Sequence, residues 1–549
     1  MKEARDILSL FEALNNHEVF TPPRVARDVI SLLPIELWTN PKLKVLDPCA
    51  KSGVFLREIF FRLVDGLHGY GAFTADDGIT YDLNNRQELI NHILKNMLFG
   101  IATSELTGYV TRRTLYGVME ANTDKQIAAI ECFEKSASYK DWSEQERLDF
   151  IGRNKFNEYY DHSLFGGNFY KGYESEGNIF YPTNEVRKKV LEDGGYTVED
   201  TYYPFIESST KHRLINHVKA GKMKFDVIIG NPPYQVNTSE HSKQAKPIYN
   251  LFVEQAIRLN PSYVVMITPS RWFTGGMGLS SFRNMMMTSR KINRLVDFPN
   301  SKDCFPGVSI SGGVSYFVWD KNFDGCCEFT SMRGGVEKNF RNDFTRHPIV
   351  IRHLESVEIL EKIAQKVQKY LAEKVSPINA FNIASSFRGD SSPRNPKDSV
   401  EVIHSRGTGF TNVDNITNGL ELLPKYKVVV SRTVAEHANE PSKDGKFKVL
   451  ARVLILEPGQ VCTHSYLVVS TFDTYSDAAY CKSYLMSKLV RFLILQTLTG
   501  IDLSRERFKL VPDPTIFRDI SSDEEIYRYF DLSKESIDFI DEMIKPMEE

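Results

Sequence analysis

The sequence predicts a doubly wound α/β sheet with a large insertion, followed by a second domain of α+β structure. Three observations lead to this fold class. Short apolar runs alternate with helical patterns over the first 330 residues, as expected for a parallel sheet covered by helices. Residues 118–222 interrupt that alternation and form the insertion. The chain has 549 residues, more than the roughly 250–300 that one core usually serves, so residues 331–549 are assigned to a second domain.

Composition and charge narrow the classes of function. The net charge of −3 gives no overall attraction to nucleic acid, so such a partner would need a local basic groove. The seven cysteines are scattered and include no C-x-x-C pair. This pattern is typical of reduced thiols and argues against a zinc site or a disulfide framework. No apolar run reaches the roughly 18 residues that span a membrane, and the N-terminus lacks a signal-peptide core. We therefore expect a cytoplasmic protein without membrane contact.

The stretch 224–234 (Lys-Phe-Asp-Val-Ile-Ile-Gly-Asn-Pro-Pro-Tyr) carries the clearest chemical signal. Its apolar run, Val227 to Ile229, predicts a short buried strand. The two prolines that follow fix φ near −65° and remove backbone donors, so the chain must leave the sheet in a stiff turn. Open α/β sheets bind ligands at the carboxyl ends of their strands. The turn therefore holds an amide, Asn231, and an aromatic ring, Tyr234, in fixed relation at a predicted ligand site.

An amide and an aromatic ring in this arrangement suit the methylation of a planar amino group. The lone pair of such a group is delocalised into its ring, which makes the nitrogen a poor nucleophile. The side-chain oxygen of Asn231 and the carbonyl of Pro232 could accept its two hydrogens, while Tyr234 stacks on the ring. The alternative is a Pro-Pro turn that only leaves a core strand.

A second signal follows the strand predicted at Leu43 to Leu46. The turn Asp-Pro-Cys-Ala-Lys-Ser-Gly, residues 47–53, leads into a helix, which is the first βα unit of a doubly wound sheet. The carboxylate of Asp47 suits a positively charged ligand better than a phosphate. An ordinary βα turn is the alternative. A third segment, Phe-Thr-Pro at residues 20–22, precedes a helical pattern and could equally be a helix cap.

Together these segments resemble the motifs of the gamma-class DNA adenine-N6 methyltransferases, specifically the Eco57I-like restriction-modification methylase family. The resemblance covers about residues 17–320, in the motif order X, I, IV, VIII. Lys51 departs from it, because the family pattern has its first glycine there, and Ala102 stands where an acidic residue usually binds the cofactor ribose.

The resemblance implies a Rossmann-like methyltransferase domain that uses S-adenosyl-L-methionine to methylate N6 of an adenine flipped out of double-stranded DNA. It implies that Tyr234 and Phe305 clamp the flipped base, with core packing as the alternative for Phe305. Glu105 is our substitute for the missing ribose ligand. The catalytic residues implied are Asn231, Pro232, Pro233 and Tyr234, and the cofactor-binding residues are Phe20, Thr21, Asp47, Pro48, Gly53, Phe55 and Glu105.

The second domain resembles a target-recognition domain that would contact phosphates and base edges. A helix is predicted from Ala478 to Thr497, among several strands. Solvated surface charge is the alternative reading of each basic residue. The candidate DNA contacts are Lys243 and Lys246 in a polar loop of the first domain, and Arg388, Arg394, Arg505 and Arg507 in the second.

Other functions remain open from the sequence. An RNA adenine methyltransferase or a protein glutamine methyltransferase would share the Asn-Pro-Pro-Tyr turn, although the glutamine enzymes are usually far shorter. A degenerate methylase acting as a DNA-specificity subunit is consistent with Lys51 and Ala102. The intact Asn231 turn favours an active enzyme in a restriction-modification or phage-defence system. A nuclease or helicase activity is expected in a separate partner subunit.

Overall fold

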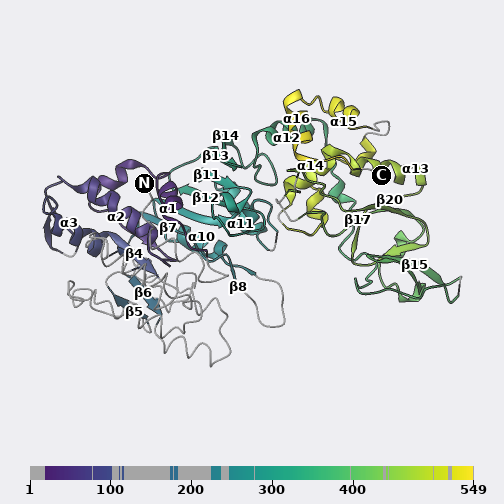
Figure 1. The fold of residues 1–549 in the computed structure, drawn as a ribbon, viewed down its shortest axis with the longest axis horizontal. Coiled ribbons are helices and arrows are strands. Elements are labelled where there is room, and N and C mark those ends of the chain that lie inside the picture. Colours follow the sequence, from purple (N-terminus) through teal and green to yellow (C-terminus); the bar gives the residue numbers. More distant parts are fainter. Residues whose placement is uncertain are drawn as a thin grey trace.

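The computed structural model describes residues 19–101 (except 77), 111, 114–115, 173–176, 179–182, 224–236 and 246–547 (except 277, 396, 437–440, 443, 499 and 517–521). Within these residues the chain forms two modules that lie side by side along the long axis of the molecule (Figure 1). The first contains the large sheet, and the second contains two small sheets and most of the later helices.

A ten-stranded sheet organises the first module. β1 pairs in parallel with β4 and β7, and β7 pairs in parallel with β10. β12 runs antiparallel between β10 and β11, and the two outermost strands, β14 and β5, pair antiparallel with their neighbours. This confirms the predicted doubly wound sheet. In spatial order the strands are β14 (Val336–Asn342), β13 (Cys327–Arg333), β11 (Ile292–Phe298), β12 (Val314–Asp320), β10 (Tyr263–Pro269), β7 (Val227–Gly230), β1 (Val45–Asp47), β4 (Leu98–Ile101), β6 (Ile179–Pro182) and β5 (Tyr173–Glu176).

The central strands are apolar throughout because both of their faces are covered. Successive side chains of β7 point to opposite faces: Val227 and Ile229 join one hydrophobic core, and Ile228 joins another. Helices α1, α2 and α3 pack in the first core, and α10 and α11 pack in the second. Their bounds are α1 (Pro23–Ile30), α2 (Val54–Leu67), α3 (Arg86–His92), α10 (Tyr249–Arg258) and α11 (Ser280–Thr288). Two short hairpins, β2 (Ala72–Thr74) with β3 (Thr80–Asp82) and β8 (Gln235–Val236) with β9 (Lys246–Pro247), complete the module.

Both edges of the sheet extend beyond the plain alternation of strands and helices. On one side, β6 and β5 come from within residues 118–222 and continue the sheet beyond β4. On the other side, β13 and β14 carry the sheet past residue 330 to Asn342. The insertion and the segment after residue 330 therefore both contribute strands to the ten-stranded sheet.

The second module is built around β17, whose alternate residues enter two cores. Val428 and Val430 face the helices, and Val429 faces the smaller core beneath β15. The module has two three-stranded sheets. In spatial order, the first consists of β16 (Gly407–Asn412), β15 (Ser399–His404) and β19 (Gln460–Cys462). The second consists of β18 (Val453–Leu456), β17 (Tyr426–Ser431) and β20 (Tyr466–Phe472). Its helices are α12 (Leu354–Lys366), α13 (Tyr475–Met486), α14 (Lys488–Thr497), α15 (Asp523–Tyr529) and α16 (Lys534–Met543).

The single helix predicted from Ala478 to Thr497 is wrong, because the structure has two helices there. Ser487 separates them with extended backbone angles and caps α14, its hydroxyl accepting the amide hydrogen of Val490 at 3.4 Å. A serine side chain that can satisfy a helix amide competes with continuation of the preceding helix.

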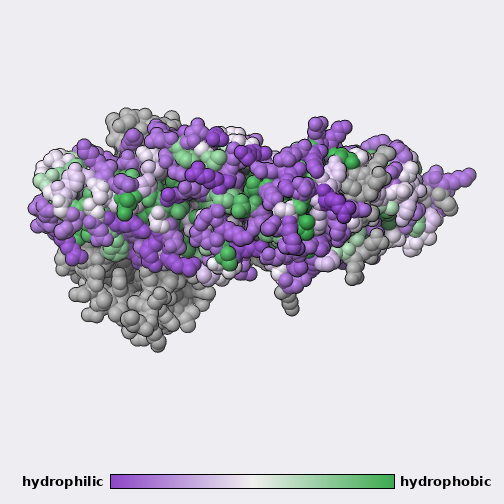
Figure 2. Space-filling view, turned by 90° about the horizontal axis from the view of Figure 1, so that it is seen from above, coloured by the Kyte–Doolittle hydropathy of each residue, from purple (hydrophilic) through white to green (hydrophobic). Residues whose placement is uncertain are grey.

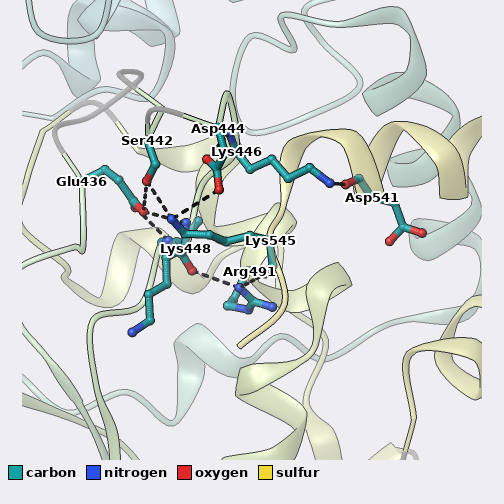
Figure 3. Close-up of polar contacts among 9 residues, drawn as sticks. Glu436, Ser442, Asp444, Lys446, Lys448, Arg491, Asp541 and Lys545 are labelled. Carbon is teal, nitrogen blue, oxygen red and sulfur yellow. Dashed lines mark hydrogen bonds and ion pairs between the residues drawn. The ribbon is translucent and has the colours of Figure 1, made fainter. Parts of the chain in front are cut away.

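A polar network holds Glu436 and the segment from Lys446 to Val449 against the C-terminal part of the chain (Figure 3). The buried guanidinium of Arg491 donates to the carbonyls of Lys448 and Lys545, at 3.2 and 2.8 Å. The Glu436 carboxylate accepts the amide hydrogens of Lys448 and Val449. Val449 has φ of 70°, which is strained for a β-branched residue. The two amide contacts to Glu436 help to hold it in that conformation.

The face seen from above in Figure 2 is largely hydrophilic, with apolar residues in scattered small patches. Among the helices of the described residues, none is long and apolar enough to cross a membrane.

Candidate active site

The site begins where β7 ends, at the carboxyl edge of the sheet. Gly230 is the last residue of β7, and a Cβ atom there would lie 2.6 Å from the Cys49 sulfur and 2.9 Å from Oδ1 of Asp47. Both distances are shorter than real contacts allow, so only glycine fits. The absence of a side chain lets the turn after β7 lie directly against the turn after β1. The two predicted motifs therefore lie in contact with each other.

Asn231 is held in a single orientation by the chain that precedes α1. Its Nδ2 donates to the carbonyl of Val19 at 3.0 Å and to the hydroxyl of Thr21 at 3.1 Å. The side chain is only 3% exposed. Its Oδ1 is buried and has no hydrogen-bond partner among the described residues. Because both amide hydrogens are engaged, the oxygen is left as an acceptor for a further donor.

Tyr234 closes the turn, with its ring half-buried. Burial raises the pKa of its hydroxyl well above the ordinary value, and the neighbouring thiol of Cys304 adds to that effect. The adjacent Asn231 side chain offsets part of the rise. Tyr234 therefore stays neutral, and its hydroxyl lies near both the Asn231 amide and the segment that carries Cys304 and Phe305.

Phe305 itself is 2% exposed and packs in the hydrophobic core together with Cys304. The structure thus brings the Phe305 segment close to Tyr234 but places the ring inside the protein. For this ring to stack on a base, it would have to move out of the core. Whether it does so remains a prediction.

Asp47 forms the floor of the site at the end of β1. Its Oδ1 accepts the amide hydrogen of Cys49 at 3.1 Å, and the side chain is 2% exposed. Burial raises the pKa of Asp47 to about 7, although the Cys49 contacts and the positive charge of Lys51 act in the opposite direction. A carboxyl group in this condition becomes ionised readily when a cation is bound beside it.

The turn after β1 is compact because Gly53 adopts φ of 72°, the left-handed region that favours glycine. A Cβ there would lie 3.0 Å from Thr111. Gly53 is also the residue before α2, so the amides of the first helical turn point toward the same region.

The other predicted site residues are distributed as follows. Phe20 and Thr21 are buried beside Asn231, and Pro48 is buried in the turn after β1. Phe55 is 2% exposed within the core that α2 covers, so its ring packs against the helix side of the site. Glu105 and Lys243 lie outside the described residues, as does the side chain of Lys246.

The four arginines predicted to contact DNA differ in their surroundings. Arg394 is exposed and pairs with Asp390 at 2.8 Å, and Arg505 is exposed with its Nε bonded to the Val375 carbonyl. Arg388 is half-buried and donates to two carbonyls of its own loop.

Arg507 is turned toward the first module. It donates to the carbonyl of Thr497 and, at 3.4 Å, to the hydroxyl of Thr274. Burial lowers the pKa of Arg507 to about 10. The structure therefore places Arg507 in the contact between the two modules.

Sequence reasoning missed the carbonyl of Val19, which is the central acceptor of the site. Nothing in the identity of Val19 signals this role, because the backbone supplies the contact. Within the described part of the chain, no group of three or more His, Cys, Asp or Glu side chains could hold a metal ion.

Comparisons with known proteins show which sequences this chain is similar to. Residues 96–305 match the Eco57I restriction-modification methylase family. The chain is 34% identical over 391 residues to an "uncharacterized adenine-specific methylase" of Mycoplasma pneumoniae, a match that covers 70% of this chain and 86% of that protein.

Two solved structures share a more distant likeness. The DNA complex of the Type IIL restriction-modification enzyme MmeI matches 97% of this chain and 79% of its own, with 11% identity and a TM-score of 0.44. A modification subunit of a putative type I restriction enzyme from Vibrio vulnificus YJ016 matches 59% of this chain at 15% identity and a TM-score of 0.31. The match spans 50% of that subunit.

Proposed function

Because this chain belongs to the adenine-specific methylases of restriction-modification type, we propose that it transfers a methyl group from S-adenosyl-L-methionine to N6 of adenine in double-stranded DNA. The observation that carries the proposal is the buried, unpaired Oδ1 of Asn231 at the carboxyl edge of the sheet. Val19 and Thr21 hold this acceptor in place. It suits an exocyclic amino group, whose planar nitrogen has two N–H groups that donate hydrogen bonds.

The chemistry follows from the position of the two acceptors on this turn. Asn231 Oδ1 accepts one N6 hydrogen, and the carbonyl of Pro232 accepts the other. These bonds draw electron density onto the nitrogen and favour the tetrahedral geometry in which it is nucleophilic. Transfer of the methyl group would break its bond to sulfur and leave S-adenosyl-L-homocysteine. The methylated nitrogen would then be positively charged and would lose one proton to solvent, so no general base with a matched pKa is needed. Neither acceptor has to move during the step.

The amino-acid end of S-adenosyl-L-methionine fits the turn between β1 and α2. The positively charged ammonium group is complementary to the buried carboxyl of Asp47. Gly53 and Gly230 keep the turns around Asp47 compact, because a Cβ at either position would press against other protein atoms. Phe20, Thr21, Pro48 and Phe55 surround the same region. The bound cofactor supplies an electrophilic methyl group. The protein's part is to bind it, orient it and keep water away from it.

A base within duplex DNA is stacked and cannot reach a buried turn, so the target adenine must be flipped out. Tyr234 is the ring available beside Asn231, and stacking on it would offset part of the cost of unpairing. Phe305 would supply the opposite face once it leaves the core. The second module, with exposed Arg394 and Arg505, would hold the duplex through phosphate and base-edge contacts.

We further propose that the methyl mark protects host DNA in a restriction-modification or phage-defence system, in which a separate restriction endonuclease/helicase subunit cleaves unmethylated DNA. This rests on the family to which the chain belongs.

The test is to supply tritiated S-adenosyl-L-methionine with unmethylated genomic DNA, total RNA and a release-factor protein in parallel. The products are digested to nucleosides or amino acids and separated. Label in N6-methyladenine from DNA alone is the expected result, and the Asn231→Ala variant should leave the DNA unlabelled. Label in RNA or in glutamine would replace the proposed substrate. Cofactor binding without any methyl transfer would indicate a required partner, and no cofactor binding would favour a degenerate methylase.

A further inference from the structure

Lys51 is a buried cation at the candidate cofactor site. It lies in the turn between β1 and α2, and its side chain is only 6% exposed. Its Nζ donates to the carbonyl of Val19 at 3.3 Å. The ammonium group has three N–H donors. Within the described residues, the Val19 carbonyl is the hydrogen-bond acceptor for one of them. Burying an ammonium group with so few contacts is costly, so Lys51 is suited to a further anionic partner.

Lys51 lies in a turn that has a carboxyl group, Asp47, before it and the N-terminus of helix α2 after it. Lys51 lies near enough to Asp47 to lower its pKa against the larger effect of burial. On the other side of Lys51, α2 begins at Val54 with no acidic residue in its first turn and no side-chain cap. Its free amides add to the positive charge of Lys51. The turn thus offers one negative and one positive partner, which suits an amino-acid zwitterion.

We propose that Lys51 binds the carboxylate of the methionine end of S-adenosyl-L-methionine, while Asp47 binds the ammonium of the same group. This inference rests on the proposed function and names the residue that recognises one part of the cofactor. The family pattern has a glycine at this position, so Lys51 would provide a contact that the pattern itself does not supply.

The carbonyl of Val19 links this contact to the catalytic amide. It accepts from Nζ of Lys51 and from Nδ2 of Asn231, so both side chains are tied to one backbone atom. Lys51 therefore also positions Asn231 through Val19. Loss of Lys51 should affect cofactor binding first, and the rate of methyl transfer at saturating cofactor to a smaller extent.

The experiment measures the dissociation constants of three ligands by calorimetry: S-adenosyl-L-methionine, S-adenosyl-L-homocysteine and decarboxylated S-adenosylmethionine. The third keeps the ammonium and lacks the carboxylate. In Lys51→Met we expect the first two to bind about 10- to 100-fold more weakly, as for the loss of one hydrogen bond between charged groups. The decarboxylated ligand should change by less than about 3-fold. Lys51→Gly, which restores the family residue, should behave in the same way and guards against a packing defect of the methionine.

Lys42→Met is the matched control, because Lys42 is exposed in the segment just before β1, and its three affinities should equal those of the wild type. Equal weakening of all three ligands in both Lys51 variants would overturn the proposal in favour of a role in shaping the site. Unchanged binding of S-adenosyl-L-methionine would overturn the proposal, because it would show that Lys51 does not contact the cofactor. Tighter binding would overturn it by showing that Lys51 opposes cofactor binding. If the wild type binds none of the three ligands, both the proposed cofactor and this inference are wrong. If the wild type binds them and the Lys51 variants do not behave as expected, only this inference is wrong.

Discussion

Affinity for S-adenosyl-L-methionine should depend on pH through Asp47. Burial raises the pKa of this carboxyl to about 7, and the cofactor ammonium requires its ionised form. With a pKa of about 7, about a tenth of the carboxyl groups are ionised at pH 6 and about nine tenths at pH 8. The affinity should therefore rise about tenfold between these two values.

Calorimetry at pH 6, 7 and 8 measures this directly. At pH 6 binding should release close to one proton per cofactor, detected as a dependence of the heat on the ionisation enthalpy of the buffer. At pH 8 the release should be close to zero. Asp47→Asn removes the titrating group, so its affinity should be weaker and independent of pH.

The raised pKa of Asp47 also determines how the free energy of unfolding changes with pH when no cofactor is bound. The folded carboxyl has a raised pKa, so the folded chain keeps a proton that the unfolded chain loses at the ordinary value of 3.8. The contribution of Asp47 to the free energy of unfolding is fully present below about pH 4 and is lost as the pH rises to about 7. An affinity that is flat from pH 6 to 8, with no proton release, would refute the assignment of Asp47 to the cofactor ammonium.

Three further substitutions test the site and the contact between the modules. Thr21→Val removes the hydroxyl that accepts from Asn231 at 3.1 Å, so methyl transfer at saturating cofactor should slow about 2- to 10-fold in single-turnover assays; an unaltered rate would mean that Thr21 does not orient the amide. Tyr234→Ala should abolish the fluorescence rise of 2-aminopurine at the target site, and Tyr234→Phe should keep it; equal loss in both would count against stacking. Arg507→Met should lower the free energy of unfolding by about 1–3 kcal/mol in denaturant titration, because it leaves the Thr497 carbonyl unpaired. Normal stability with loss of DNA binding would instead make Arg507 a DNA contact.

The parts of the fold that sequence reasoning predicted are those determined by local pattern. The run Val227 to Ile229 had to be a strand buried on both faces, and the two prolines after it had to end that strand. Asp47 and Asn231 each follow a strand, so a parallel sheet brings them to the same edge. Their proximity follows from topology alone.

The features of the fold and the site that could not be predicted from the sequence depend on contacts between residues far apart in the chain. The carbonyl of Val19 reaches Asn231 across 212 positions in sequence, and side-chain identity says nothing about such a backbone acceptor. The guanidinium of Arg507 bonds to Thr497 and Thr274, contacts that its basic loop does not signal, and its predicted contact with DNA stays a prediction. Similarly, the edge strands β5 and β6 pair with β4, although they come from an insertion whose composition suggests no sheet.

The most direct test of the central claim is the single-turnover rate of methyl transfer to DNA by Asn231→Ala, with cofactor affinity measured on the same preparation. Removing one preorganised hydrogen-bonding group from a reacting centre typically costs about 10²- to 10³-fold in rate. We predict a loss of at least that size, with the dissociation constant for S-adenosyl-L-methionine within about twofold of the wild type. A rate within about tenfold of the wild type would contradict the claim that the Asn231 oxygen activates the amino group.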